Sequence, residues 1–391
     1  METTKKFIGE VLVEIADAIE TGNFGEKVRI GITTFDSEHG AENIIRGAKQ
    51  AQKENSNIEV CLIGNEVDEN LKFYKVVDAK EAHSKMEELL DSGEINACVT
   101  SHYNFPIGVS TIGRVITPGI GKEMLIATTT GTSATNRIEG MVKNALYGIA
   151  TSKAIGFEKP TVGILNVDGA RQVERSLKTL NENGYKIDFA ESKRADGGCV
   201  MRGNDLLQGT PDVMVTDSLT GNLLMKMFSA YQTGGSYEAS GFGYGPGIGE
   251  NYNRKILILS RASGEPVVKN AIKYAAEMAI GNVSNIANEE IKLAKKAKLD
   301  DIISELNKSK KVESNAEEVK MPKKEVVISA ISGIDIMDLE DAVQSLWKAE
   351  IYAESGMGCT GPIVLVSEKN LEVAVGVLTK AGFVSQEGNI C

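Results

Sequence analysis

Short apolar runs alternate with longer segments of helical period along the first 260 residues of the chain. The apolar runs predict strands at 27–35, 58–64, 95–101, 123–130, 161–167, 211–217 and 255–260. The segments between them predict helices at 37–54, 79–93, 138–156, 170–184 and 219–230. Because the strands are apolar on both faces, the pattern indicates an α/β fold whose mostly parallel sheet is covered by helices on both sides. Ligands bind such sheets at the C-terminal ends of the strands.

The pattern changes between residues 286 and 324, which are heavily charged and carry few large apolar side chains. We interpret this segment as a solvated helix followed by a linker. Beyond it the sequence predicts strands at 325–333 and 363–367 and helices at 338–349 and 370–382. The chain therefore divides into an α/β domain (1–285), the charged helix and linker (286–324), and a small C-terminal α/β domain (325–391) with a possible ferredoxin-like βαββαβ order.

Composition restricts the partners and the location of the protein. A chain of 391 residues exceeds the usual size of one hydrophobic core, so we expect more than one domain. The formal net charge of -11 argues against non-specific binding of nucleic acid and against adhesion to anionic membranes. No apolar run approaches the length of a membrane span, and residues 1–22 resemble an amphipathic helix rather than a signal peptide. We expect a cytoplasmic protein that binds neither nucleic acid nor membrane.

Cysteine and glycine usage adds two expectations. The five cysteines are odd in number and widely spaced, which argues against a disulfide framework and a zinc site. The three histidines do not approach a metal-ligand spacing with them, so we expect no metal. The glycine-rich stretch 233–250 predicts a long loop of functional or mobile character.

The segment ESGMGCTGPIVLV (354–366) sets one thiol among glycines. We expect Cys359 on a loop before the strand at 363, because this glycine pattern does not suit a helix or a strand interior. Backbone N–H groups around Gly356, Gly358 and Gly361 could lower the pKa of the thiol and hold the oxygen of an acyl group. A thiol nucleophile that carries a substrate fragment is one interpretation. A small buried hydrophobic residue is the other, and the pattern alone leaves both open.

The segment VMVTDSLTGNLLMK (213–226) runs from a strand into a helix. Hydroxyls and backbone N–H groups at a helix start can bind phosphate, although the same residue types cap helices for structural reasons alone. The spacing is not that of a Walker A loop. The candidate substrate-binding residues are Thr216, Asp217, Ser218, Thr220, Gly221 and Asn222.

Three further segments have structural and functional interpretations. The hydroxyl-rich segment ATTTGTSATNR (127–137) follows a strand and could line a pocket or cap a helix. The segment SHYNFPIG (101–108) brings His102 near Cys98, but Cys98 falls inside an apolar run and is expected in the core. The segment GFGYGPGIG (241–249) precedes a strand, so it does not meet the requirement of a dinucleotide-binding loop.

Two parts of the sequence resemble known families. The segments RIEGMVKNALYGIATSKAIG (137–156), TVGILNVDG (161–169) and RGNDLLQGTPDVMVTDSLTGNLLMK (202–226) resemble the PlsX-type phosphate acyltransferases, over roughly residues 27–281. Those enzymes make acyl phosphate from an acyl thioester and inorganic phosphate. Ordinary members lack the C-terminal domain with its cysteine segment. Taken together, both parts resemble the alpha subunits of component C of glycine/sarcosine/betaine reductase complexes, over essentially the whole chain.

The resemblance implies a reaction of anaerobic amino-acid fermentation. A selenoprotein, component A, carries a carboxymethyl group, and component C takes it over as an acetyl thioester on a cysteine, which corresponds to Cys359. Phosphate then releases acetyl phosphate, and the phosphate-handling turn corresponds to Thr216 through Asn222. The implied partners are the beta subunit of component C and component A. No cofactor is implied besides phosphate as a substrate, and the complex-specific donor (glycine, sarcosine or betaine) stays open.

Other functions remain compatible with the sequence. A PlsX-like acyltransferase could use a soluble acyl thioester without a covalent step, or the chain could be a non-catalytic docking subunit. An inactive PlsX-like scaffold is the third alternative. If Cys359 is the carrier, the linker could let the small domain move its thiol between partners. Any general base must come from outside residues 325–391, because that segment contains no histidine.

Overall fold

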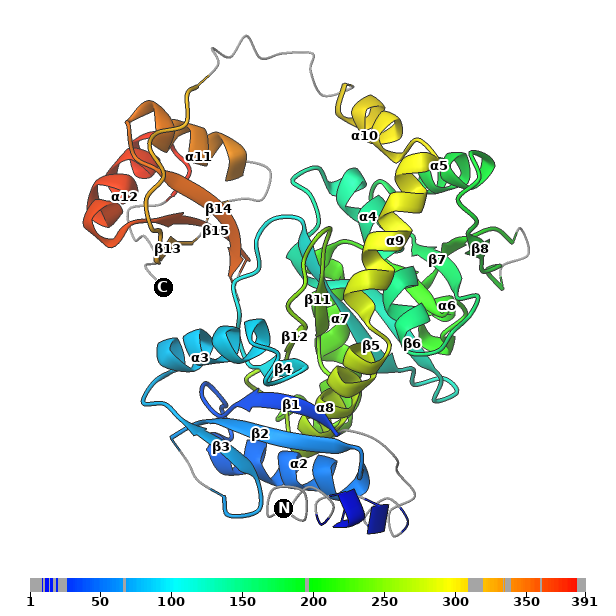
Figure 1. The fold of residues 1–391 in the computed structure, drawn as a ribbon. Helices are drawn as coiled ribbons and strands as arrows, with labels where there is room; N and C mark the ends of the chain where they lie inside the picture. The colour runs from blue at the N-terminus through cyan, green and yellow to red at the C-terminus, as the bar shows by residue number, and fades with distance from the viewer. Residues whose placement is uncertain are drawn as a thin grey trace.

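A computed structural model gives the structure of the chain (Figure 1). It describes residues 27–65, 68–193, 197–308, 319–332, 334, 339–358 and 361–384, together with 9, 11–13, 15, 16 and 19. The predicted N-terminal helix therefore lies mostly outside the described residues, as do residues 309–318 of the predicted linker. None of the described helices is both long and apolar enough to cross a membrane.

The body of the protein contains a twelve-stranded mixed sheet with the order β3-β2-β1-β4-β12-β11-β5-β6-β10-β7-β8, and β9 pairs with β7. The strands are β1 (Val28–Thr33), β2 (Ile58–Gly64), β3 (Lys72–Lys75), β4 (Ala97–Thr100), β5 (Val109–Ile116), β6 (Glu123–Thr132), β7 (Thr161–Leu165), β8 (Asp188–Phe189), β9 (Val200–Met201), β10 (Val213–Val215), β11 (Gly245–Ile248) and β12 (Ile256–Ile258). The seven predicted strands are confirmed, whereas β3, β5, β8, β9 and β11 were not predicted.

The sheet consists of two parallel parts joined by antiparallel strands. The first half-sheet is β3-β2-β1-β4-β12, and the second half-sheet is β6-β10-β7 with β8 and β9. Strands β11 and β5 pair antiparallel with each other and with their outer neighbours. The expected mostly parallel sheet is therefore confirmed, and its interruption by β11 and β5 creates a junction between the half-sheets.

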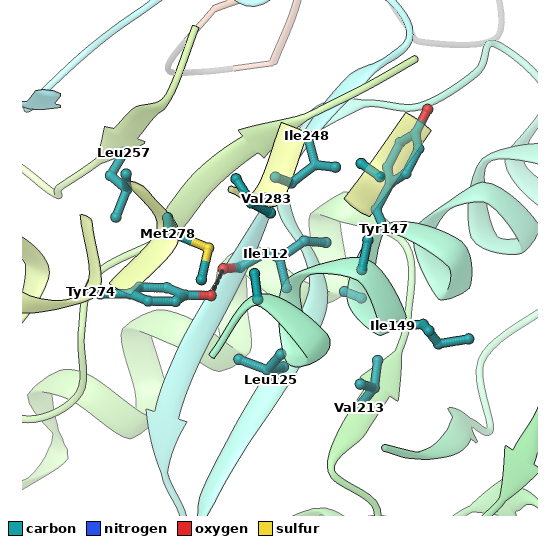
Figure 2. Packing of buried hydrophobic residues seen from close by; sticks show 14 of the residues in the cluster. Ile112, Leu125, Tyr147, Ile149, Val213, Ile248, Leu257, Tyr274, Met278 and Val283 are labelled. Carbon is teal, nitrogen blue, oxygen red and sulfur yellow. Dashed lines mark hydrogen bonds between the residues drawn. The ribbon is translucent and has the colours of Figure 1, made fainter. Parts of the chain in front are cut away.

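Helices cover both faces of the sheet (Figure 1). They are α2 (Gly40–Glu54), α3 (Ala79–Asp91), α4 (Arg137–Ala154), α5 (Ala170–Glu182), α6 (Gly203–Gln208), α7 (Ser218–Ala230), η1 (Tyr231–Thr233), α8 (Glu265–Ile280), α9 (Val283–Lys296) and α10 (Leu299–Lys308). Figure 2 shows the core where α8 and α4 pack against the junction strands. There the Tyr274 hydroxyl donates a 3.1 Å hydrogen bond to the carbonyl of Ile112, which satisfies a polar group in a fully buried position.

The glycine-rich stretch 233–250 is not simply a long loop, which corrects the sequence-based prediction. Strand β11 lies within it and fills the gap between β12 and β5. Gly245 has a φ of 87°, and a Cβ atom there would lie 1.7 Å from the carbonyl oxygen of Ile112. The glycines here allow the backbones of the junction strands to approach closely, so their role is steric.

The charged segment from residue 286 also differs from the prediction. The first residues of this segment belong to α9 (Val283–Lys296), which buries Ala287, Ile291 and Ala294 in the core of the body. Gly281, just before this helix, is needed for the close approach to α4, because a Cβ there would lie 2.0 Å from the carbonyl oxygen of Ala154. The helix therefore exposes its charged face and packs its small apolar face, instead of being solvated all round.

The C-terminal part forms a small domain with its own core. It contains β13 (Ser329–Ile331), α11 (Leu339–Lys348), β14 (Ala353–Gly358), β15 (Gly361–Val366), η2 (Glu368–Asn370) and α12 (Leu371–Lys380). Strand β15 lies between β13 and β14 and is antiparallel to both. This is the split βαβ arrangement of a ferredoxin-like order, without a final strand among the described residues.

The glycine segment before residue 359 is a strand, although its glycine pattern was not expected to suit one; the predicted loop at Cys359 itself lies outside the described residues. Strand β14 pairs with β15 up to Gly358 opposite Gly361, and Gly356 lies opposite Ile363. We call the two paired strands the hairpin; they flank Cys359 and Thr360 in the sequence. Both of these residues lie outside the described residues, and so does the predicted environment of the thiol.

Candidate active site at the junction of the half-sheets

A pocket of about 190 Å³ lies where the first half-sheet meets β6 and α7. We call it the junction pocket, and its polar lining is Glu38, Ser101, His102, Tyr103, Thr130, Asn222, Lys226, Ser260 and Arg261. These residues follow or end strands β1, β4, β6 and β12, or lie on α7. The polar residues after several strands therefore converge on one site, as expected for an α/β sheet.

Lys226 is fixed in this pocket by a buried carboxylate. Its Nζ lies 2.9 Å from Oγ of Ser260 and 3.4 Å from Oε1 of Glu238, whose residue is only 1% exposed. Glu238 also accepts hydrogen bonds from Ser263 (3.0 Å) and the Tyr244 hydroxyl (3.3 Å). Burial, and then the Glu238 charge, raise the pKa of Tyr244, so its hydroxyl stays a donor. The network holds the ammonium group at the edge of the pocket.

His102 supplies an imidazole to the same pocket. Burial lowers the pKa of His102, and the charges of His83 and Arg261 lower it further, against an opposing effect of Asp36. The ring of His83 lies 6.2 Å away and also has its pKa lowered, mainly by burial. His102 is therefore a neutral imidazole near pH 7, the form that can accept a proton.

The hairpin of the small domain reaches this pocket. Gly358, the last described residue of β14, is part of the pocket lining together with Asn222 and Lys226. An antiparallel bridge between Gly356 and Pro106 attaches the hairpin to the body, and Ile107 packs against the core of the small domain. The chain thus leads from the wall of the pocket directly to Cys359, the next residue in the sequence.

The six residues predicted to form one phosphate-binding turn do not line a single pocket. Thr216 is fully buried, and its carbonyl accepts a 3.0 Å hydrogen bond from Asn144. Asp217 caps α7 by accepting from N–H and Oγ1 of Thr220 (3.0 and 2.8 Å), and it pairs with Arg137 at 3.0 Å. Burial acts to raise the pKa of Asp217, but the Thr220 hydrogen bonds and Arg137 outweigh it and lower the pKa. Asp217 and Thr216 thus have clear structural roles.

A second pocket, of about 780 Å³, lies on the other side of the first turn of α7. We call it the helix-start pocket, because α4, α5 and α7 begin at it; its polar lining includes Thr128, Thr132, Ser133, Asn136, Arg137, Asp168, Asp217, Ser218 and Thr220. Gly221 lines neither pocket and lets α7 approach β6 closely, because a Cβ there would lie 1.7 Å from the carbonyl oxygen of Thr128. Of the six predicted turn residues, Asn222 lines the junction pocket, and Asp217, Ser218 and Thr220 line the helix-start pocket.

The described cysteines are core residues. Cys61, Cys98 and Cys199 are buried, and burial raises the pKa of Cys61 to about 12 and that of Cys199 to about 11. Cys98 is fully buried, which confirms its expected core position, and this burial raises its pKa and so disfavours a thiolate paired with His102. Within the described ranges, no group of three or more His, Cys, Asp or Glu side chains is placed to hold a metal ion.

Three residues of the junction pocket, Lys226, Ser260 and Arg261, were not predicted as site residues from the sequence. For Lys226 a signal was present, because it lies four residues after Asn222 and so shares its helix face. Ser260 ends the predicted strand 255–260 and Arg261 directly follows it, but only the pairing of β12 with β4 and β11 brings them to the junction.

Several known proteins are similar to this chain. The family described as "Fatty acid synthesis protein" matches residues 28–365. The glycine/sarcosine/betaine reductase complex component C subunit alpha of Peptoclostridium acidaminophilum is 64% identical over 385 residues, 98% of this chain and 100% of that protein. A phosphate acyltransferase of Thermotoga petrophila is 27% identical over 235 residues, 51% of this chain and 67% of that protein. A branched-chain phosphotransacylase structure from Enterococcus faecalis V583 has a TM-score of 0.47 at 12% identity, covering 64% of this chain and 98% of that one.

The fold and the junction pocket define an α/β protein with a mostly parallel, helix-covered sheet, a polar pocket at the junction of its half-sheets and an added small C-terminal domain. The chain belongs to the fatty acid synthesis protein family and, within it, to the family of alpha subunits of component C of glycine/sarcosine/betaine reductase complexes. The match to the component C relative spans the small domain, whereas the phosphate acyltransferase of T. petrophila matches only about half of the chain.

Proposed function

We propose that this chain accepts an acetyl group on Cys359 as a thioester and releases it to inorganic phosphate as acetyl phosphate. The observation that carries the proposal is Gly358: the residue before Cys359 lines the junction pocket together with Asn222 and Lys226. The relatives' names support the two halves of this function, since one is a reductase-complex subunit and the other a phosphate acyltransferase. The small domain contributes Gly358 and the proposed carrier Cys359, and the body contributes the other residues of the pocket lining.

The proposed chemistry is an acyl transfer from sulfur to oxygen. An oxygen of phosphate attacks the thioester carbonyl and forms a C–O bond, the C–S bond breaks, and the thiolate leaves with its electron pair. In this proposal His102, a neutral imidazole in the lining of the junction pocket, exchanges a proton with the thiol or with the attacking phosphate. Donors in the pocket, such as the Asn222 amide, stabilise the developing oxyanion. No resident cofactor is needed for this step.

The relative's name, a subunit of component C of a reductase complex, supports the proposal that this chain acts with other proteins, without naming them. We propose that the acetyl group comes from a selenoprotein component A and that the chain acts beside a component C beta subunit in the cytoplasm. This role requires that another protein reach the thiol. The attachment of the hairpin through Pro106 and Gly356 is consistent with an acyl group delivered at the junction pocket after that loading step.

The test is mass spectrometry of the full chain after incubation with acetyl phosphate, with and without the partner subunit. The reverse reaction is expected to place one acetyl group on the peptide that contains Cys359. Cys359→Ala should lose the adduct, whereas Cys391→Ala, at the other cysteine outside the described residues, should keep it. An adduct on the partner subunit alone would reject the carrier role and favour the docking-subunit alternative.

A further inference from the structure

Two cationic side chains, Lys226 and Arg261, line the junction pocket and come from separate elements. Lys226 lies on α7, which follows the second half-sheet, and Arg261 follows β12 of the first half-sheet. The ammonium group of Lys226 has three donors, and the described residues offer it two acceptors, Ser260 and Glu238. One N–H of Lys226 therefore remains for a ligand, in a position that the buried carboxylate of Glu238 holds fixed.

Arg261 has its guanidinium group available. The backbone carbonyl of Arg261 accepts a 2.9 Å hydrogen bond from the N–H of Glu38, which anchors the loop. Among the described residues, no hydrogen bond or ion pair engages the guanidinium, and the residue is exposed. A guanidinium fork suits two oxygens of one phosphate, and an ammonium group suits a third.

The charge of the lining favours an anion in this pocket over the helix-start pocket. The junction pocket is lined by two cations, Lys226 and Arg261, and one carboxylate, Glu38, with a neutral His102. Glu238 pairs with Lys226 from behind the lining and is not itself part of it. The helix-start pocket is lined by one cation, Arg137, and two carboxylates, which already pair with it. Three helix starts supply N–H groups there, but the carboxylates oppose a phosphate at short range.

We propose that inorganic phosphate binds in the junction pocket between Lys226 and Arg261, with Asn222 as an additional donor. The inference rests on the proposed function, in which phosphate is the acyl acceptor, and it moves the phosphate away from the start of α7. The Asn222 amide donates to the carbonyl of Thr129 at 3.2 Å, which leaves its second N–H for the pocket. Phosphate bound here lies against the same wall as Gly358, next to the residue that carries the acyl group.

The experiment is a titration of the full chain with inorganic phosphate, followed by calorimetry or ³¹P NMR. Arg261→Gln should raise the Kd for phosphate at least about tenfold, because a charge-assisted hydrogen-bond pair is lost. Lys226→Met should raise it by a similar factor, and Lys226→Arg should recover part of the affinity. Arg137→Gln, which removes the cation of the helix-start pocket, should change the Kd by less than about twofold.

Folding is controlled in two ways. Lys226→Met leaves Glu238 buried without its cation and can lower stability, so Arg261→Gln, at an exposed side chain, is the decisive variant. An unchanged phosphate Kd in folded Arg261→Gln, or a loss of binding in Arg137→Gln, would overturn the proposed site. The acetyl adduct on Cys359, loaded by the partner components without phosphate, is measured on the same variants. If Arg261→Gln carries the acetyl adduct on Cys359 and has an unchanged phosphate Kd, the phosphate site is rejected and the carrier function stands. If Arg261→Gln has a raised phosphate Kd but the adduct does not form, the carrier function is rejected and the phosphate site stands.

Discussion

The junction pocket and the helix-start pocket lie on either side of the first turn of α7, and they differ in the sign of the charge that lines them. Both contain hydroxyl groups and both receive backbone from strand ends. In the helix-start pocket, Asp217 uses its carboxylate to cap α7 and to pair with Arg137. In the junction pocket, the corresponding buried carboxylate, Glu238, lies beneath Lys226 and leaves one of its donors free. Hydroxyl-rich helix starts therefore serve here as caps, while the fixed cation marks the ligand site.

The largest effect is expected at Gly221, whose substitution disturbs both pockets at once. Gly221→Ala would place a Cβ atom 1.7 Å from the carbonyl oxygen of Thr128, so α7 must move away from β6. We expect a loss of about 3 kcal/mol in the free energy of unfolding, measured by urea denaturation. Gly140→Ala is the matched control, because the nearest atom to its added Cβ lies at 3.6 Å. The control should be neutral or stabilising by up to about 1 kcal/mol; similar losses in both variants would contradict the steric account.

A change confined to the junction pocket is expected to weaken phosphate use without unfolding the protein. Glu238→Gln removes the charge that fixes Lys226 but keeps the volume and one acceptor. The KM for phosphate in acetyl phosphate formation should rise roughly 3- to 10-fold, with a smaller change in kcat. Glu139→Gln, whose partner Lys143 lies 2.7 Å away on α4, is the control and should leave the KM unchanged. Equal effects of both substitutions would mean that Glu238 acts only through general electrostatics.

The hydrophobic pattern of the sequence predicted some strands and helices of the structure and missed others. The β-branched runs of β1, β2, β7 and β12 predicted their strands well because they are buried on both faces. Strand β11 (GPGI) has no strand propensity and is defined only by the space between β12 and β5. Helix α8 was not predicted, although a proline in its first turn and its helical period were present in the sequence.

The candidate site was predictable only in part, because its residues come from segments that lie far apart in the sequence. Asn222 was identified because it lies at a strand-to-helix turn, and Gly358 because of its glycine-rich surroundings. The charge balance of a pocket depends on residues from separate segments, so Arg261 and Glu38 could not be assigned to it from spacing. The capping role of Asp217 likewise required the contact with Arg137, which is 80 positions away.

A change confined to the helix-start pocket is expected to affect stability in a pH-dependent way. The pKa of Asp217 is lowered in the folded state, so its charge contributes stability above the pKa of the unfolded chain, about 3.9, and this contribution is lost as the pH falls through the folded-state pKa. Asp217→Asn keeps an oxygen for capping but loses the charge. We expect a loss of about 1 kcal/mol at pH 7 that shrinks as the pH falls below about 3.9 and disappears below the folded-state pKa, measured by urea denaturation. A loss that persists at low pH would assign the effect to the cap geometry instead of the charge.

The smallest effect concerns the thiols that lie outside both pockets. In a Cys359→Ser/Cys391→Ser variant, Cys61, Cys98 and Cys199 should not react with a maleimide at pH 7, because burial limits access and raises their pKa. All three should react after unfolding in urea, as counted by mass spectrometry. Rapid labelling of the native variant would show that a core thiol competes with Cys359 as a nucleophile.

The most direct test of the account is a crystal structure of the full chain soaked with arsenate, a phosphate analogue whose arsenic gives an anomalous signal. If phosphate binds between Lys226 and Arg261, we expect an anomalous peak in the junction pocket, within hydrogen-bond distance of Nζ of Lys226 and of the Arg261 guanidinium. A peak at the start of α7 beside Arg137 and Thr220, with an empty junction pocket, would contradict it and return the phosphate site to the helix-start pocket.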